Sequence, residues 1–163
     1  MSQVTLEIAV VLLLIVVNGV FAMSELAIVS ARRVRLERMA REGNRGAQAA
    51  LDLVDTPNRF LSTVQIGITL VGIFAGAYGG ATIAGELAIL LRQSEFIAPY
   101  AGGLSLFIVV GAITFLSVVI GELVPKRIAL QSAERISAVV ARPMQLLSVL
   151  ATPIVRLLSL STE

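Results

Sequence analysis

The sequence predicts an all-α membrane protein, and three observations support this fold class. Of the 163 residues, 56% are hydrophobic and 15% are charged, whereas soluble domains carry about 25% charged residues. The apolar residues collect in windows long enough to cross a bilayer, which takes about 20 helical residues. The chain contains neither cysteine nor histidine, which argues against disulfides, thiolate zinc sites and imidazole-bound metals. A metal ion bound here would therefore have oxygen ligands.

Three windows have the composition and length of transmembrane helices, at residues 6–31, 60–85 and 96–121. The second and third contain no charged residue. Pro57 lies just before the second window and suits the first turn of a helix. The first window is interrupted by Glu25 close to its end. We expect three transmembrane helices within a single transmembrane domain that covers residues 1–163.

The segments between and after these windows are also helical in pattern. Residues 32–56 predict a cytoplasmic helical hairpin, with Gly43 and Gly46 as its break. Residues 126–160 predict interfacial helices, because their central apolar stretch between two arginines is too short to span and contains prolines. A fourth, kinked span is the alternative.

The distribution of basic residues predicts the orientation of the chain. Cytoplasmic loops of membrane proteins carry an excess of lysine and arginine. Of the 13 basic residues, all except Arg92 lie either between the first and second windows or after the third. We therefore expect a multi-pass protein of the plasma (inner) membrane, with its N-terminus outside and its C-terminus in the cytoplasm.

Two acids lie near the predicted cytoplasmic ends of the first and third windows. The helical rise places both Glu25 and Glu122 within about 10 Å of that boundary. A carboxylate in a membrane span usually faces a cavity, a partner or an ion. The alternative is that Glu122 pairs with Lys126 at i,i+4 and that Glu25 reaches the neighbouring arginines.

Pro125 distinguishes the third window from an ordinary helix end. If the helix continues through this proline, the carbonyl of Gly121 loses its backbone partner, because proline has no amide hydrogen. A free carbonyl next to the carboxylate of Glu122 suits a hard cation. The alternative is a proline that only ends the helix at the interface.

Small and polar residues at helical spacing add further oxygen atoms or packing surfaces. In the second and third windows they are Ser62, Gln65, Thr69, Gly72, Gly76, Thr114, Ser117 and Gly121. Such stripes are also typical of helix-packing seams. Ser24, beside Glu25, and Asn18 add polar groups to the first window, and Ser24 alternatively bonds back to its own helix. Together these residues predict a polar pocket that opens to the cytoplasm and suits Mg²⁺, Ca²⁺, Na⁺ or a proton.

Three stretches resemble, in order and spacing, the transmembrane domain of the CorC and cyclin M magnesium transporters. They are FAMSELA at 21–27, QIGITL at 65–70 and GELVPK at 121–126. The resemblance implies a homodimer, with three transmembrane helices per protomer above a belt of cytoplasmic helices. It also implies Mg²⁺ bound between the helices.

The family motifs assign the metal site to Ser24, Glu25, Gly121 and Glu122. Gly67 and Thr69, in the middle motif, are further candidates. Ser117, from the polar stripe of the third window, is the last candidate.

The resemblance also implies the function, which is Mg²⁺ efflux, with Na⁺ as the coupling ion. Family members usually continue into paired cystathionine-synthase-type ATP-binding domains, so we expect this sequence to be the transport domain without that regulator. One alternative is a proton-coupled exporter of small organic cations, although the chain has no tryptophan to line such a pocket. Another is an Mg²⁺-sensing membrane anchor that transports nothing.

Other classes of protein fit the sequence poorly. The usual sets of nucleophile and base and a Walker-type loop do not occur in it, so we do not expect an enzyme. The arginines of residues 32–45 have the density of a nucleic-acid patch. Beside a membrane span, however, we expect them to meet anionic lipid headgroups rather than nucleic acid.

Overall fold

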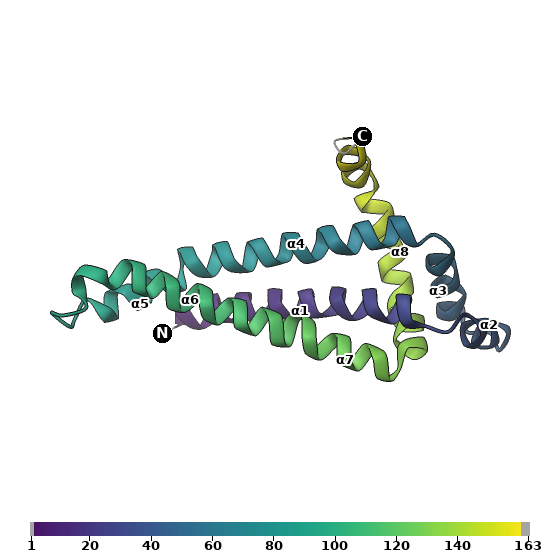
Figure 1. The fold of residues 1–163 in the computed structure, drawn as a ribbon, viewed down its shortest axis with the longest axis horizontal. Coiled ribbons are helices and arrows are strands. Elements are labelled where there is room, and N and C mark those ends of the chain that lie inside the picture. The colour runs from purple at the N-terminus through teal and green to yellow at the C-terminus, as the bar shows by residue number, and fades with distance from the viewer. Residues whose placement is uncertain (1, 161–163) are drawn as a thin grey trace. The chain divides into compact units, whose positions relative to one another are not determined.

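The computed structural model describes residues 2–160, with side chains for residues 3–153. Met1 and Ser161–Glu163, the two ends of the predicted domain of residues 1–163, lie outside the described residues. The described chain is helical and contains no strand, which confirms the all-α class (Figure 1). Its elements are α1 (Ser2–Ser30), α2 (Arg33–Arg41), α3 (Arg45–Asp55), α4 (Pro57–Ala81), α5 (Ile83–Leu91), η1 (Ala98–Tyr100), α6 (Ala101–Val118), η2 (Val119–Leu123), α7 (Val124–Gln131) and α8 (Ala133–Leu160).

Four helical stretches of the described chain are long and apolar enough to cross a membrane. They are Gln3–Ser30, Pro57–Leu91, Ala98–Gln131 and Ala133–Pro153. The first three overlap the windows 6–31, 60–85 and 96–121 that the sequence predicts as spans, and the fourth lies within the predicted interfacial segment of residues 126–160. By length and composition the chain is therefore a multi-pass membrane protein, and its number of spans stays a prediction.

The chain packs as two compact units. Unit 1 comprises Met1–Gly19 and Thr69–Leu123, and unit 2 comprises Val20–Ile68 and Val124–Glu163. The helices α1 and α4 each have one part in either unit. Each unit has its own buried apolar cluster.

Unit 1 is held together by apolar side chains from the first half of α1, the second half of α4, α5 and α6. Its buried cluster consists of Val11, Ile15, Ala75, Ala84, Val109 and Ile113. A Cβ atom at Gly79 would lie 2.2 Å from the Ile113 side chain. This glycine therefore allows α4 to contact α6 closely.

The second predicted span is not one continuous helix. The helix α4 ends at Ala81 and α5 begins at Ile83, so a break at Thr82 divides the predicted window of 60–85. The hydroxyl of Thr82 donates to the carbonyl of Tyr78 over 2.8 Å. Two consecutive glycines just before the break weaken the helix, because glycine is a poor helix former.

The third predicted span continues past its expected end. After α6, the backbone forms the π-helical turn η2 and then α7, so helical structure runs through Pro125. A π-helical turn changes the spacing of the backbone hydrogen bonds. This change relieves the clash that a proline makes with the carbonyl four residues earlier.

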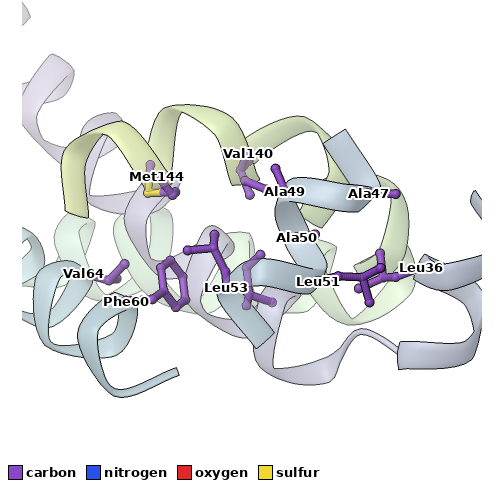
Figure 2. Close-up of a cluster of buried hydrophobic side chains, with 12 residues drawn as sticks. Leu36, Ala47, Ala49, Ala50, Leu51, Leu53, Phe60, Val64, Val140 and Met144 are labelled. Carbon is purple, nitrogen blue, oxygen red and sulfur yellow. The ribbon is translucent and has the colours of Figure 1, made fainter. Parts of the chain in front are cut away.

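Unit 2 has a core between α3, α8 and the neighbouring ends of α2 and α4 (Figure 2). Its buried side chains include Leu36, Ala47, Ala50, Leu53, Phe60, Val64, Val140 and Met144. The carboxamide of Gln145 adds polar links from α8 to α3, because its Nε2 donates to the Ala49 carbonyl over 3.1 Å and to Asp52 over 3.3 Å. The α3–α8 contact thus combines an apolar centre with a polar edge.

The two glycines between α2 and α3 have different roles. Gly43 has a positive φ of 90° and forms the turn after α2. Asn44 caps α3, since its side-chain oxygen accepts from the amides of Gly46 and Ala47. Gly46 is already inside α3, and a Cβ atom there would lie 1.9 Å from the Ala138 carbonyl oxygen of α8. Gly46 is therefore a packing residue rather than part of the break.

Exposed ion pairs link residues along α2 and join the start of α2 to the end of α3. Arg33 pairs with Glu37 over 3.0 Å and with Asp55, and Arg38 pairs with Glu42 over 2.9 Å. The hydrogen bond to Asp55, followed by the one to Glu37, raises the pKa of the Arg33 guanidinium above its ordinary value. Such solvent-exposed pairs stabilise a fold only weakly.

The helix α8 runs without a break past Pro143, one of the prolines in the predicted interfacial segment. Pro143 and Val139, whose carbonyl loses its partner, lie one turn apart on the exposed side of the helix. The lost hydrogen bond therefore lies on the side away from the core of unit 2.

Candidate functional site

The central polar feature of unit 1 is a buried contact between α1 and η2. The side-chain Nδ2 of Asn18 donates to the carbonyl oxygen of Gly121 over 3.3 Å, and both residues are buried. A Cβ atom at Gly121 would lie 3.2 Å from both the Asn18 Nδ2 and the Ile15 carbonyl oxygen. The glycine therefore brings the backbone of η2 against α1.

This contact corrects the expectation of a bare carbonyl at Gly121. The helix does continue through Pro125, but the Asn18 amide binds the carbonyl. The sequence indicated Asn18 as a polar group of the first window, but not as one of the candidate metal ligands. The signal that could have found it is an asparagine inside an otherwise apolar transmembrane window, because a buried amide needs hydrogen-bond partners.

The other side-chain atom of Asn18 is an available oxygen. Its Oδ1 is buried and has no hydrogen-bond partner within the described chain. A carbonyl oxygen has two lone pairs, so the bond from Asn18 does not by itself prevent the Gly121 carbonyl from binding a cation. Unit 1 thus holds two buried oxygens, from one side chain and one backbone group, that are able to bind a cation.

Three more candidates belong to unit 1. Glu122 follows Gly121 in η2 and is half-buried. Ser117 is half-buried near the end of α6, whereas Thr69 is exposed on α4. Single π-helical turns occur frequently at functional sites, and here the turn carries both Gly121 and the acid.

Ser24, Glu25 and Gly67 belong to unit 2. Ser24 is fully buried, and its hydroxyl donates to the Val20 carbonyl over 2.6 Å, which is the bond back to its own helix that the sequence offered as an alternative. The oxygen of this hydroxyl remains an acceptor. A Cβ atom at Gly67 would lie 2.9 Å from the Phe21 ring, so close packing accounts for the lack of a side chain at this position.

Glu25 takes no part in the ion pairs that the described residues of unit 2 form. This carboxylate is half-buried on α1. Within the described residues, the α2 arginines form ion pairs with Glu37, Glu42, Asp55 and Glu134, and not with Glu25. The alternative in which Glu25 is neutralised by the neighbouring arginines therefore lacks support.

A buried acid of unit 1 lies outside the candidate set. Glu7 on α1 is only 9% exposed, and its Oε2 has no hydrogen-bond partner in the part of the chain that is described. No group of three or more aspartate, glutamate, histidine or cysteine side chains gathers among the described residues in a way that could hold a metal ion. A cation site in this chain would therefore combine few acids with hydroxyl, amide and backbone oxygens.

Comparisons with known proteins identify related chains. A family model described as the cyclin M transmembrane N-terminal domain matches residues 8–163. The UPF0053 protein sll0260 of Synechocystis sp. is 56% identical over 162 residues, which is 99% of this chain and 36% of the relative. The UPF0053 protein YhdT of Bacillus subtilis is 35% identical over 146 residues, or 90% of this chain and 32% of the relative.

A third relative has a descriptive name. The polyamine export protein of Escherichia coli K12 is 31% identical over 149 residues, which is 91% of this chain and 33% of that protein. The chain thus spans about a third of the length of the curated relatives that it matches.

Proposed function

This chain belongs to the cyclin M transmembrane family, and we therefore propose that it is the membrane part of a cation transporter whose substrate is Mg²⁺. The observation that carries the proposal is the buried pair of Asn18 and Gly121, with the unpartnered Asn18 Oδ1. A buried acceptor without a partner costs about 1–3 kcal/mol. A bound cation would satisfy this acceptor, and Mg²⁺ takes oxygen ligands of this kind.

In the proposed site, each residue of unit 1 has a distinct role. The Gly121 carbonyl and the Asn18 Oδ1 supply neutral oxygens, and Glu122 supplies negative charge. The bond from Asn18 Nδ2 to Gly121 holds the two oxygen-bearing groups in place before the ion arrives. Preorganised ligands lower the cost of binding, because fewer side chains must be ordered.

The remaining ligands follow from the sequence motifs. The prediction that Ser24 and Glu25 bind the same ion, with Thr69, Ser117 and Gly67 as secondary candidates, is open to test by substitution. Because Mg²⁺ dehydrates reluctantly, we propose that water molecules complete its coordination. Efflux as the direction and Na⁺ as the coupling ion remain part of the proposal.

We further propose a homodimer with three spans per protomer and α8 in the membrane interface. The buried side of α8 packs on α3, while Arg135 and Arg142 are exposed on its other side. Arginines in such positions favour the interface over the bilayer centre. This arrangement keeps the N-terminus outside and the C-terminus in the cytoplasm of a plasma-membrane protein.

A second candidate substrate is an organic polycation. The relative from Escherichia coli is a polyamine export protein by name. The ammonium groups of a polyamine donate hydrogen bonds, which carboxylates and carbonyl oxygens accept. A site with few acids and several neutral oxygens suits this substrate too, so the two cations must be compared directly.

The test is cation flux into proteoliposomes that contain the purified chain and an internal Mg²⁺-sensitive dye. We expect Mg²⁺ flux that falls more than tenfold in Asn18→Leu and Glu122→Gln. Glu86→Gln, which removes an exposed acid of α5, serves as the matched control and should leave the flux unchanged. Radiolabelled spermidine replaces Mg²⁺ in a parallel experiment.

Each outcome of these experiments separates two candidates. Spermidine flux without Mg²⁺ flux would make the polyamine the substrate. Calorimetric binding of Mg²⁺ without flux of either cation would favour the sensing anchor. If the wild type and Glu122→Gln bound Mg²⁺ with equal affinity, Glu122 would not be a ligand.

A further inference from the structure

Unit 2 contains a basic groove that none of the candidate cation residues lines. The groove has a volume of about 400 Å³ and lies where the turn between α2 and α3 meets α8. Arg45 lines it from α3, and Arg135 and Arg142 line it from α8. Met39, Ala138 and Val139 supply apolar atoms. The groove therefore combines three guanidinium groups with an apolar wall.

The positive charge of this groove is not compensated by acids. No aspartate or glutamate is among the described residues that line it. The nearby Arg33, Arg35 and Arg38 all have carboxylate partners, whereas Arg45, Arg135 and Arg142 form no ion pair with another described residue. Arginine is the side chain best suited to bind phosphate, because its planar fork donates two parallel hydrogen bonds.

The exposed side of α8 alternates basic and apolar residues. Arg135, Val139, Arg142, Leu146 and Val149 follow one another at steps of four and three residues, so they share one face of the helix. Val139 is 76% exposed, Leu146 63% and Val149 60%. The opposite face, with Val140 and Met144, is buried in the core of unit 2 (Figure 2).

A second groove extends this exposed face. It has a volume of about 460 Å³, and Arg142 lines both grooves. Leu146 and Val149 of α8 and Phe60 of α4 give it an apolar wall. An amphiphile with a phosphate in the first groove would find apolar side chains along the same helix face in the second.

We propose that Arg45, Arg135 and Arg142 bind the phosphate of an anionic phospholipid headgroup, and that Val139 and Leu146 contact its acyl chain. A soluble phosphate compound would bind the arginines but would leave the exposed Val139 and Leu146 in contact with water. A lipid satisfies both features, and helices with arginines and exposed apolar residues on one side are typical of membrane interfaces. The site does not depend on the cation proposal, because the two share no residue.

The test is native mass spectrometry of the whole chain in detergent, titrated with dioleoylphosphatidylglycerol or dioleoylphosphatidylcholine. The groove variant carries Arg45→Gln, Arg135→Gln and Arg142→Gln. The matched variant carries Arg32→Gln, Arg38→Gln and Arg41→Gln, which remove the same charge from residues that do not line the groove. Far-UV circular dichroism checks that each variant is helical.

We expect the wild type and the matched variant to bind phosphatidylglycerol more tightly than phosphatidylcholine. Each basic residue near an anionic lipid contributes roughly fivefold in affinity. The groove variant should therefore bind phosphatidylglycerol on the order of a hundredfold more weakly. Equal affinities of the groove variant and the wild type, or equal losses in both variants, would overturn the proposal.

Two further measurements separate a lipid from a free phosphate. Val139→Ser with Leu146→Ser leaves the arginines in place and should weaken phosphatidylglycerol binding several-fold. Glycerol 3-phosphate has the phosphate without the acyl chains and should compete poorly. If the serine variant retained full affinity, or glycerol phosphate bound as tightly as the lipid, the ligand would not be a lipid.

Discussion

The Asn18 amide donates to the Gly121 carbonyl over 3.3 Å, and it thereby joins two residues that are 103 positions apart in the sequence. The bond links α1 to the π-helical turn that carries Glu122. In an apolar surrounding, neither group has water as a substitute partner. The stability of unit 1 and the position of the proposed cation ligands therefore depend on the same contact.

The first prediction concerns this hydrogen bond directly. Asn18→Leu removes the donor and leaves the buried Gly121 carbonyl without it, at a cost of about 1–3 kcal/mol, and the removal of the unpartnered Oδ1 offsets part of this cost. The fold should therefore be destabilised, but by less than the full cost. The measurement is thermal unfolding in detergent, followed by circular dichroism. Asn58→Leu, at an exposed position near the start of α4, should leave the melting temperature nearly unchanged. Equal melting temperatures of all three proteins would show that the contact contributes nothing.

The second prediction concerns the space at Gly121. Gly121→Ala places a Cβ atom 3.2 Å from the Asn18 Nδ2 and the Ile15 carbonyl, so α1 must shift, at a cost of about 1–3 kcal/mol. Gly111→Ala is the matched control in α6, because a Cβ atom there meets nothing within 4 Å. That control should be neutral or slightly stabilising, because alanine favours helices. The reverse order of melting temperatures would contradict the proposed packing.

The third prediction concerns the contact between α3 and α8. In Gly46→Ala the Cβ atom would lie 1.9 Å from the Ala138 carbonyl oxygen, which no rotation of a side chain relieves. We expect α3 to move away from α8 and the melting temperature to fall by more than in Gly121→Ala. Gly85→Ala has open space around it and serves as the control. Hydrogen exchange of the α3 amides locates the effect, and unchanged protection there would count against it.

Much of the helical structure could be predicted from local signals. Windows without charge locate the long apolar helices, and the turn around Gly43 lies where the glycines indicate it. Gly46 shows the limit of such signals, because its role depends on Ala138, which is 92 residues away. The break at Thr82 was also missed, since nothing charged interrupts that window.

At the candidate site, too, local sequence signals predict the backbone features but not the tertiary contacts. Pro125 indicates the Gly121 carbonyl as a candidate ligand, because the loss of an amide hydrogen is a local property of the backbone. The partner of that carbonyl was not predictable, since Asn18 reaches it through tertiary packing. A buried amide in an apolar window should therefore be included among the candidate ligands of membrane chains.

The last prediction tests whether Pro125 maintains the proposed cation site. Pro125→Ala restores a backbone amide that can donate to the Gly121 carbonyl and compete with Asn18 for it. The helix should then become more regular, with an equal or higher melting temperature. Under the proposed function, Mg²⁺ affinity should nevertheless fall about tenfold or more, because the oxygens lose their arrangement.

Calorimetric titration with Mg²⁺ measures this change, and Pro143→Ala in α8 is the matched control. Stability and affinity that rose together would indicate that the proline serves only to shape the helix.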